Sequence, residues 1–169
     1  MSFVEKVSND GAKAFLAFIK VGHGQNQLGN PLRVLTLYHI YSSFEVLRRL
    51  RTELAAAARQ KSAGSDLCLS ELEQLPYLTA VLIEGLRLSP AIATRDARAA
   101  PDRDLHYEGW RIPVGTQVGM TTILVHHYPD LYPDQARFNP EKWMGMDVRK
   151  KSEKTCAPFS RGRRICMGM

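Results

Sequence analysis

The sequence lacks any apolar run long enough to cross a membrane. A transmembrane helix needs about 18 or more consecutive apolar residues, and charged or polar residues interrupt every stretch of that length here. The first 20 residues carry Glu5, Lys6, Asp10 and Lys13, which is wrong for the apolar core of a signal peptide. The chain as written is therefore expected to be cytoplasmic.

Aromatic residues are also scarce, at 8%, and they are not interleaved with the basic residues. The net charge of +6 therefore comes without the pattern of a nucleic-acid interface, and no nucleic-acid-binding motif is visible. A solvated basic surface is the favoured interpretation, and an acidic protein partner or an anionic ligand stays open. A basic adaptor for nucleic acid is the weakest interpretation, and it would predict salt-sensitive binding that needs no cysteine.

Cysteines are few as well. Cys68, Cys156 and Cys166 are far apart and form no C-x-x-C pair, and their odd number argues against a disulfide framework. What remains open is one reactive or ligating thiol. The hydrophobic content of 44% is ordinary for a globular domain.

Apolar spacing predicts helices in the first half of the chain. Residues 31–40 look like the end of a buried helix, and Ser42 with Glu45 forms a capping-box pattern before a helix over 44–58. One face of that helix is apolar, with Val46, Leu47, Leu50 and Leu54. The opposite face is expected to meet water, with Arg48, Arg49, Arg51 and Glu53.

A second capping pattern, Ser70 with Glu73, precedes a strongly apolar helix over 75–88, which Pro90 ends. After it the period changes. Residues 105–107 and 110–112 are predicted to be two short strands joined by a tight turn. A second turn would have Pro113 and Gly115 at its second and fourth positions, before a strand or short helix at 118–124 and a long irregular connection from Tyr128.

The most informative stretch closes the chain. It fits the pattern F-x-x-G-x-R-x-C-x-G with Phe159, Gly162, Arg164, Cys166 and Gly168. At average composition, such a match arises by chance about once in several million positions. The pattern therefore singles out Cys166.

The residues around this cysteine suit a ligand. Arg161, Arg163 and Arg164 supply a positive field that favours the thiolate, the form in which cysteine binds metals. The glycines let the backbone curl close to the sulfur. The alternative is a buried structural cysteine beside a solvated arginine cluster, which this context makes the weaker interpretation.

With this motif the chain resembles the cytochrome P450 family. The resemblance implies that Cys166 is the axial ligand of haem b iron, whose thiolate favours O–O cleavage. It also implies that Phe159 packs beside the sulfur, that Gly162 makes the turn, that Arg164 pairs with a haem propionate, and that Gly168 gives the backbone room.

A second match is the E-x-x-R of Glu84 and Arg87, in a helix that is apolar nearly all round. Charges there should be buried and need good partners. The family supplies a third member from a P-E-R-F segment, where this chain has Lys142 in place of arginine. Lysine keeps the charge but loses the planar fork.

The resemblance assigns further roles between these matches. Arg98 would hold the other propionate, and residues 91–94 would line an apolar substrate pocket. His126 falls where the family often has a histidine, and a hydrogen-bonded structural role is the favoured interpretation of it.

The family's oxygen-activating motif, A-G-x-[DE]-T-T, aligns with residues 23–28. Only Gly24 survives, because Asn26, Gln27 and Leu28 replace the acid and the two threonines. Pro31 is expected to disturb a helix at this point. No catalytic residue of that motif is therefore intact.

The expected fold is mainly α with a small β-sheet, a partial P450 fold. It would keep the end of the I helix, the J and K helices, the small sheet, the meander and the cysteine loop. It would lack the distal N-terminal helices and the helix after the cysteine. We expect one truncated domain over 1–169, with a degenerate distal-helix segment at 1–30, helices at 31–90, the small sheet at 91–125, and the meander and haem loop at 126–169.

The implied function is a haem-thiolate monooxygenase that inserts one oxygen atom of O2 into an apolar small molecule. The sequence texture resembles fungal P450s of secondary metabolism. An NADPH-dependent reductase would dock on the basic residues near 149–151, although a solvated basic loop explains them as well. The alternative is an inactive truncated remnant without stable haem, and a full-length relative would be membrane-anchored.

Overall fold

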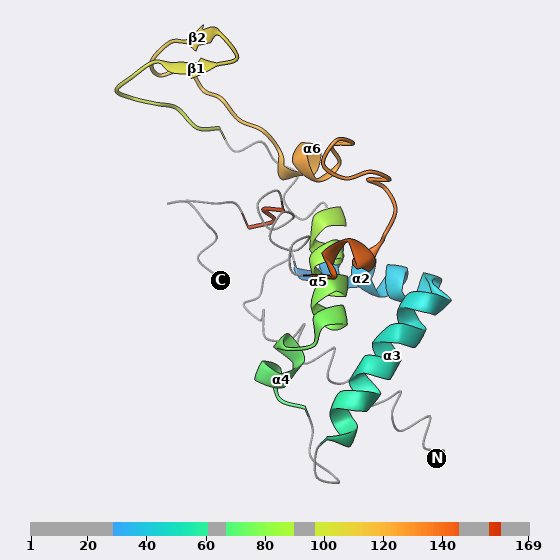
Figure 1. The fold of residues 1–169 in the computed structure, drawn as a ribbon. Helices are drawn as coiled ribbons and strands as arrows, with labels where there is room; N and C mark the ends of the chain where they lie inside the picture. The colour runs from blue at the N-terminus through green and yellow to red at the C-terminus, as the bar shows by residue number, and fades with distance from the viewer. Residues whose placement is uncertain (1–28, 61–66, 90–96, 146–155, 160–169) are drawn as a thin grey trace.

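The computed structural model describes residues 29–60, 67–89, 97–145 and 156–159, with side chains from residue 32 onward. These ranges are mainly helical with one small antiparallel sheet, as predicted (Figure 1). The elements are α2 (Gly29–Ser42), α3 (Phe44–Arg59), α4 (Leu69–Glu73), α5 (Pro76–Leu88), β1 (Leu105–Tyr107), β2 (Trp110–Ile112), α6 (Thr122–His126) and the 3-10 helix η1 (Pro140–Trp143). No helix in this part of the chain is long and apolar enough to cross a membrane.

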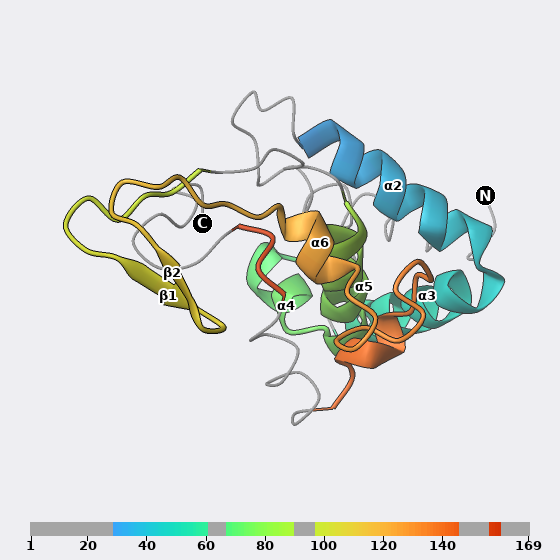
Figure 2. The same ribbon diagram turned by 90° about the horizontal axis from the view of Figure 1, so that it is seen from above.

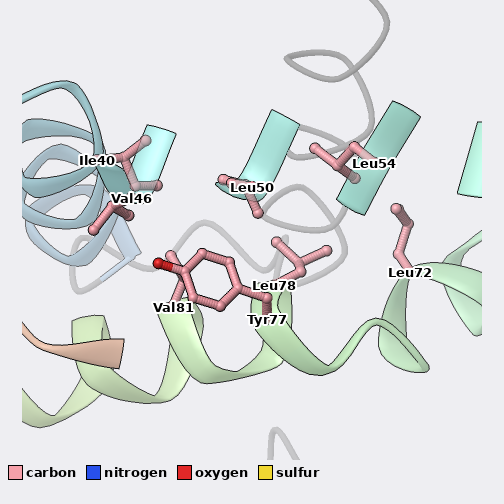
Figure 3. Packing of buried hydrophobic residues seen from close by; sticks show 8 residues of the cluster. All are labelled: Ile40, Val46, Leu50, Leu54, Leu72, Tyr77, Leu78 and Val81. Carbon is pink, nitrogen blue, oxygen red and sulfur yellow. The ribbon is translucent and has the colours of Figure 1, made fainter. Parts of the chain in front are cut away.

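The main core lies between α3 and the helices α4 and α5. Figure 3 shows the apolar face of α3 turned toward α5, as its spacing predicts. Each fully buried aliphatic side chain stabilises the fold by about 1.5–3 kcal/mol relative to an exposed one. The buried members of this cluster are Ile40, Val46, Leu50, Leu54, Leu72, Tyr77, Leu78 and Val81.

The helix starts differ in detail from the prediction. Ser42 is still the last residue of α2, and Ser43, with extended backbone, caps α3 by accepting the Val46 N–H at 3.4 Å. Before α4 the cap is Cys68, whose N–H donates to the Glu71 carboxylate at 2.7 Å. Both predicted caps were out of register because an S-x-x-E pattern does not say where the preceding segment ends.

Glu53 was predicted to face water and instead caps α5. Its carboxylate accepts the backbone N–H groups of Tyr77 and Leu78, both at 2.8 Å. These N–H groups belong to the first turn of α5, where no carbonyl within the helix can accept them and the helix dipole is positive. Glu53 therefore fixes the start of α5 against α3.

Helix α2 crosses α5 at a position where only glycine fits. A Cβ atom on Gly85 would lie 2.3 Å from the hydroxyl oxygen of Thr36, which is buried and donates to the Leu32 carbonyl at 2.8 Å. Pro31 does not prevent this helix, because in the described bounds it falls in the first turn, where proline's missing N–H costs no intrahelical bond.

The small sheet lies away from the helices (Figure 1). Its register pairs Leu105 with Ile112 and Tyr107 with Trp110. The turn at 108–109 has both residues at positive φ, which suits a tight two-residue hairpin.

A second turn and a backbone bridge follow the hairpin. The Thr116 N–H donates to the Pro113 carbonyl, so Gly115, with φ of 78°, is the third residue of this turn and not the fourth. Arg98 and Val118 form an isolated antiparallel bridge, and α6 follows it. In Figure 2, α6 lies over α5, which brings the end of the sheet region back to the helical core.

Candidate functional site

The site begins with a buried ion pair on α5. Glu84 and Arg87 lie one helical turn apart, and their side chains are fully buried. Arg87 Nε and Nη2 donate to the two carboxylate oxygens of Glu84, both at 2.8 Å. This two-pronged geometry is the one in which a buried pair best offsets its desolvation cost.

Arg87 also ties the following chain to α5. Its Nη1 donates to the carbonyls of His126 at 2.8 Å and Gln135 at 2.9 Å, and its Nη2 donates to the Arg137 carbonyl at 3.4 Å. The guanidinium lies 5.1 Å from the centre of the Tyr132 ring. The side chain of one arginine therefore binds the backbone carbonyls of the irregular segment after α6. These bonds hold the segment in place although it has little regular structure.

Glu84 is satisfied by two further donors from the same region. The Asn139 N–H donates to Oε1 at 3.0 Å, and the indole N–H of Trp143 donates to Oε2 at 2.8 Å. With the two bonds from Arg87, each carboxylate oxygen accepts twice, which is the full capacity of a carboxylate. Trp143 is buried and packs against Tyr132, with ring centres 6.4 Å apart.

Lys142 does not take the place predicted for it. Its ammonium group donates to the Pro133 carbonyl at 2.9 Å, while the neutral indole of Trp143 completes the shell of Glu84. Partial burial lowers the pKa of Lys142, and the negative charge of Glu84 opposes this shift. The physical reason is that a carboxylate with four donors has no acceptor site left, so the lysine stays at the rim.

His126 is a structural residue, as the favoured interpretation had it. It is buried, its Nδ1 lies 3.1 Å from the Arg87 carbonyl oxygen, and its Nε2 accepts the Ala157 N–H at 3.2 Å. Burial lowers the pKa of His126, an effect that the backbone bond to Arg87 partly offsets. The neutral ring therefore connects α5 with the segment that leads toward Cys166.

Two residues assigned to the haem lie among the described ones. Phe159 is half-buried in a turn at 158–159, and Arg98 is an exposed residue whose backbone pairs with Val118 at 2.7 and 2.8 Å. The other predicted residues lie outside the described ranges, namely Gly24, Asn26, Gln27, Leu28, Gly162, Arg164, Cys166 and Gly168. Of the predicted structural set, Glu84 and Arg87 are brought together.

The sequence reasoning missed Trp143 and Asn139 as partners of Glu84. One signal was available for Trp143, because a buried tryptophan usually needs an acceptor for its N–H. Asn139 precedes Pro140 and also caps η1 by accepting the Glu141 N–H at 3.1 Å, a role that Asn before a helical proline predicts. The backbone carbonyls that accept from Arg87 could not be predicted, because every residue type has a backbone carbonyl.

Comparisons of the sequence with known proteins point to one family. The family model described as Cytochrome P450 matches residues 33–169. Cytochrome P450 monooxygenase MO6277 of Ascocoryne sarcoides is 37% identical over 150 residues, which cover 88% of this chain and 29% of that protein. N-acetyltryptophan 6-hydroxylase ivoC of Emericella nidulans is 35% identical over 151 residues, with 88% of this chain and 29% of the relative covered.

A third relative, the Fusicoccadiene C-8 hydroxylase of Alternaria brassicicola, is 42% identical over 123 residues, which cover 73% of this chain and 23% of that enzyme. The chain thus spans less than a third of the length of these relatives. The family match covers most of the chain, including α5, the segment after α6 and the cysteine motif. The chain belongs to the cytochrome P450 family.

Proposed function

We propose that the chain is the haem-binding part of a P450 monooxygenase, with Cys166 as the iron ligand. The observation that carries the proposal is the cysteine motif from Phe159 to Gly168, which follows directly on a backbone segment tied to α5 through His126. The relatives support a monooxygenase that acts on small molecules, since their names include hydroxylases of N-acetyltryptophan and fusicoccadiene.

The chemistry of the donor set suits haem. Cys166 supplies one thiolate in a field of arginines, and Arg164 and Arg98 would pair with the two propionates. Phe159 would pack beside the sulfur, and the glycines of the motif would leave room for the backbone. When bound, haem iron supplies the dioxygen chemistry of this family.

Substrate and electron supply follow from the same proposal. An apolar small molecule, in a pathway of secondary metabolism, would meet residues 91–94 after α5. An NADPH-dependent reductase would approach the basic residues around 149–151 and those of the cysteine motif, because complementary charge speeds the encounter.

A second candidate function is an inactive P450-like chain without stable haem. One sequence observation favours it: Asn26, Gln27 and Leu28 stand where the family has an acid and two threonines for proton delivery. An amide cannot release a proton as a carboxylic acid does.

The carbon monoxide difference spectrum of the reduced, haem-supplemented protein tests for stable thiolate-ligated haem, on which the two candidates differ. The monooxygenase proposal expects a red-shifted Soret band of the thiolate type, lost in Cys166→Ala and kept in Cys68→Ala. Cys68 is exposed and serves as the matched control. A protein with no such band, or with a band that Cys166→Ala leaves unchanged, would be the inactive chain.

A further inference from the structure

His126 joins three segments of the chain at one imidazole ring. It is the last residue of α6 and is 2% exposed. Its Nε2 faces the Ala157 N–H at 3.2 Å, and its Nδ1 faces the Arg87 carbonyl at 3.1 Å. An amide N–H only donates and a carbonyl only accepts, so the ring must be neutral, with its proton on Nδ1.

The backbone of His126 is fixed as well. Its carbonyl accepts from Arg87 Nη1 at 2.8 Å, so ring and backbone are both tied to the last turn of α5. Arg87 is in turn held by Glu84 at both carboxylate oxygens. Ala157 is therefore connected through His126 to the buried ion pair on α5.

Ala157 precedes Phe159, the first residue of the cysteine motif, by two positions in the sequence. We propose that neutral His126 is a positioning residue: it anchors residues 156–159 to the end of α5, so that the cysteine motif starts from a fixed point, and its loss changes the reactivity of the Cys166 thiol. The inference rests on the proposed role of Cys166 as a haem ligand. A ligand held in place before binding loses less conformational freedom when it binds.

Protonation should break this link. The protonated ring carries a proton on both nitrogens and leaves the Ala157 N–H without an acceptor. Burial lowers the pKa of His126, and the charges of Arg87 and His127 lower it further, while the backbone bond to Arg87 and the charge of Glu84 raise it. Cys156 is the ionisable residue next to Ala157 in the third segment. The link is thus complete at neutral pH and is lost as the pH falls through a pKa below 6.5.

Amide hydrogen exchange on the full chain without haem measures the link directly. His126→Gln keeps a donor and an acceptor but does not titrate, His126→Leu keeps neither, and His106→Gln on the exposed hairpin is the control. Protection of the Ala157 amide, corrected for the intrinsic rate at each pH, should fall roughly 2- to 10-fold in His126→Leu, the effect of one lost hydrogen bond. It should fall similarly in the wild type at acid pH, while His126→Gln stays flat.

The alkylation rate of Cys166, resolved by peptide mass spectrometry, reports on the thiol itself. The alkylation rate of His126→Leu should differ from that of His126→Gln at the same pH. The rate of the wild type should differ from that of His126→Gln at acid pH. The rate of His106→Gln should equal that of the wild type. If His126→Leu does not fold, the comparison of the wild type with His126→Gln across pH still tests the inference.

Two results overturn the inference. One is equal protection of Ala157 in wild type and His126→Gln at every pH, and the other is a loss of protection with no change at Cys166. A protein that shows both effects but no thiolate-type carbon monoxide band would refute the haem proposal, while the anchoring role of His126 would stand.

Discussion

Trp143 illustrates how a neutral residue completes a charged cluster. Arg87 is the cation that pairs with the Glu84 carboxylate. The remaining acceptor sites of the carboxylate are filled by the Trp143 indole N–H and the Asn139 backbone N–H. A second buried cation would have to lose its hydration without gaining an acceptor site. The rim position of Lys142, with its pKa lowered mainly by burial, fits that cost.

This assignment predicts unequal effects for two neighbouring substitutions. Trp143→Phe removes a hydrogen bond to a buried charge and should lower the free energy of unfolding by about 1.5–3 kcal/mol. Lys142→Met removes a bond at the protein rim and should cost under about 1 kcal/mol. Urea unfolding midpoints at constant m-value measure both. If Lys142→Met costs as much as Trp143→Phe, lysine is the third member of the cluster after all.

Gly85 sits inside the E-x-x-R pattern for a steric reason. Alanine has the higher helix propensity by about 1 kcal/mol, but its Cβ would lie 2.3 Å from Thr36 Oγ1. Gly85→Ala should therefore destabilise the protein by about 1–3 kcal/mol in thermal or urea unfolding. Adding Thr36→Ala removes the clashing hydroxyl, so the double variant should lose less than the sum of the two single effects. Additive losses would mean that the helices separate freely at this crossing.

At the scale of elements, the Glu53 side chain of α3 caps the first turn of α5. Glu53→Gln removes the negative charge from the first turn of α5 and keeps one acceptor oxygen for the two N–H groups at 2.8 Å. The loss of stability should be about 1 kcal/mol. Glu73→Gln, at an exposed position on α4, makes the same charge change and should have little effect on the urea midpoint. Equal effects of the two would mean that net charge, and not capping, matters.

The helices themselves could be predicted from sequence. The helix expected over 44–58 is observed as α3 (Phe44–Arg59), because apolar residues on one face indicate its period. The helix expected over 75–88 is observed as α5, because its sequence is apolar nearly throughout up to Pro90. The caps could not, since adjacent serines at 42 and 43 offer two registers and the turn between α2 and α3 selects one.

The candidate site was predictable only in part, for a similar physical reason. Burial of Glu84 and Arg87 followed from their apolar helix. Their partners lie 39 to 59 residues away and are mostly backbone carbonyls and N–H groups, which every residue carries. The cysteine motif was visible in the sequence alone.

Across the whole molecule, two histidines link stability to pH: His126 is buried and His39 is half-buried. Burial lowers the pKa of both His39, which stacks on Phe138 with ring centres 4.7 Å apart, and His126. Below about pH 6.5 these histidines bind protons more readily in the unfolded chain than in the folded chain, so the free energy of unfolding falls as the pH drops. The loss stops once the pH is below the folded pKa, where both states carry the proton.

The free energy of unfolding should therefore decrease between about pH 6.5 and the folded pKa of His126, with a slope of at most about 1.4 kcal/mol per pH unit from this residue. His126→Gln removes the titrating group and should flatten that part of the curve. His106→Gln, on the exposed hairpin, should leave the curve parallel to the wild type. Urea titrations at several pH values measure the slope. An unchanged slope in His126→Gln would show that His126 is protonated as easily in the folded chain as in the unfolded one, and the neutral link between α5, α6 and the cysteine segment would then be wrong.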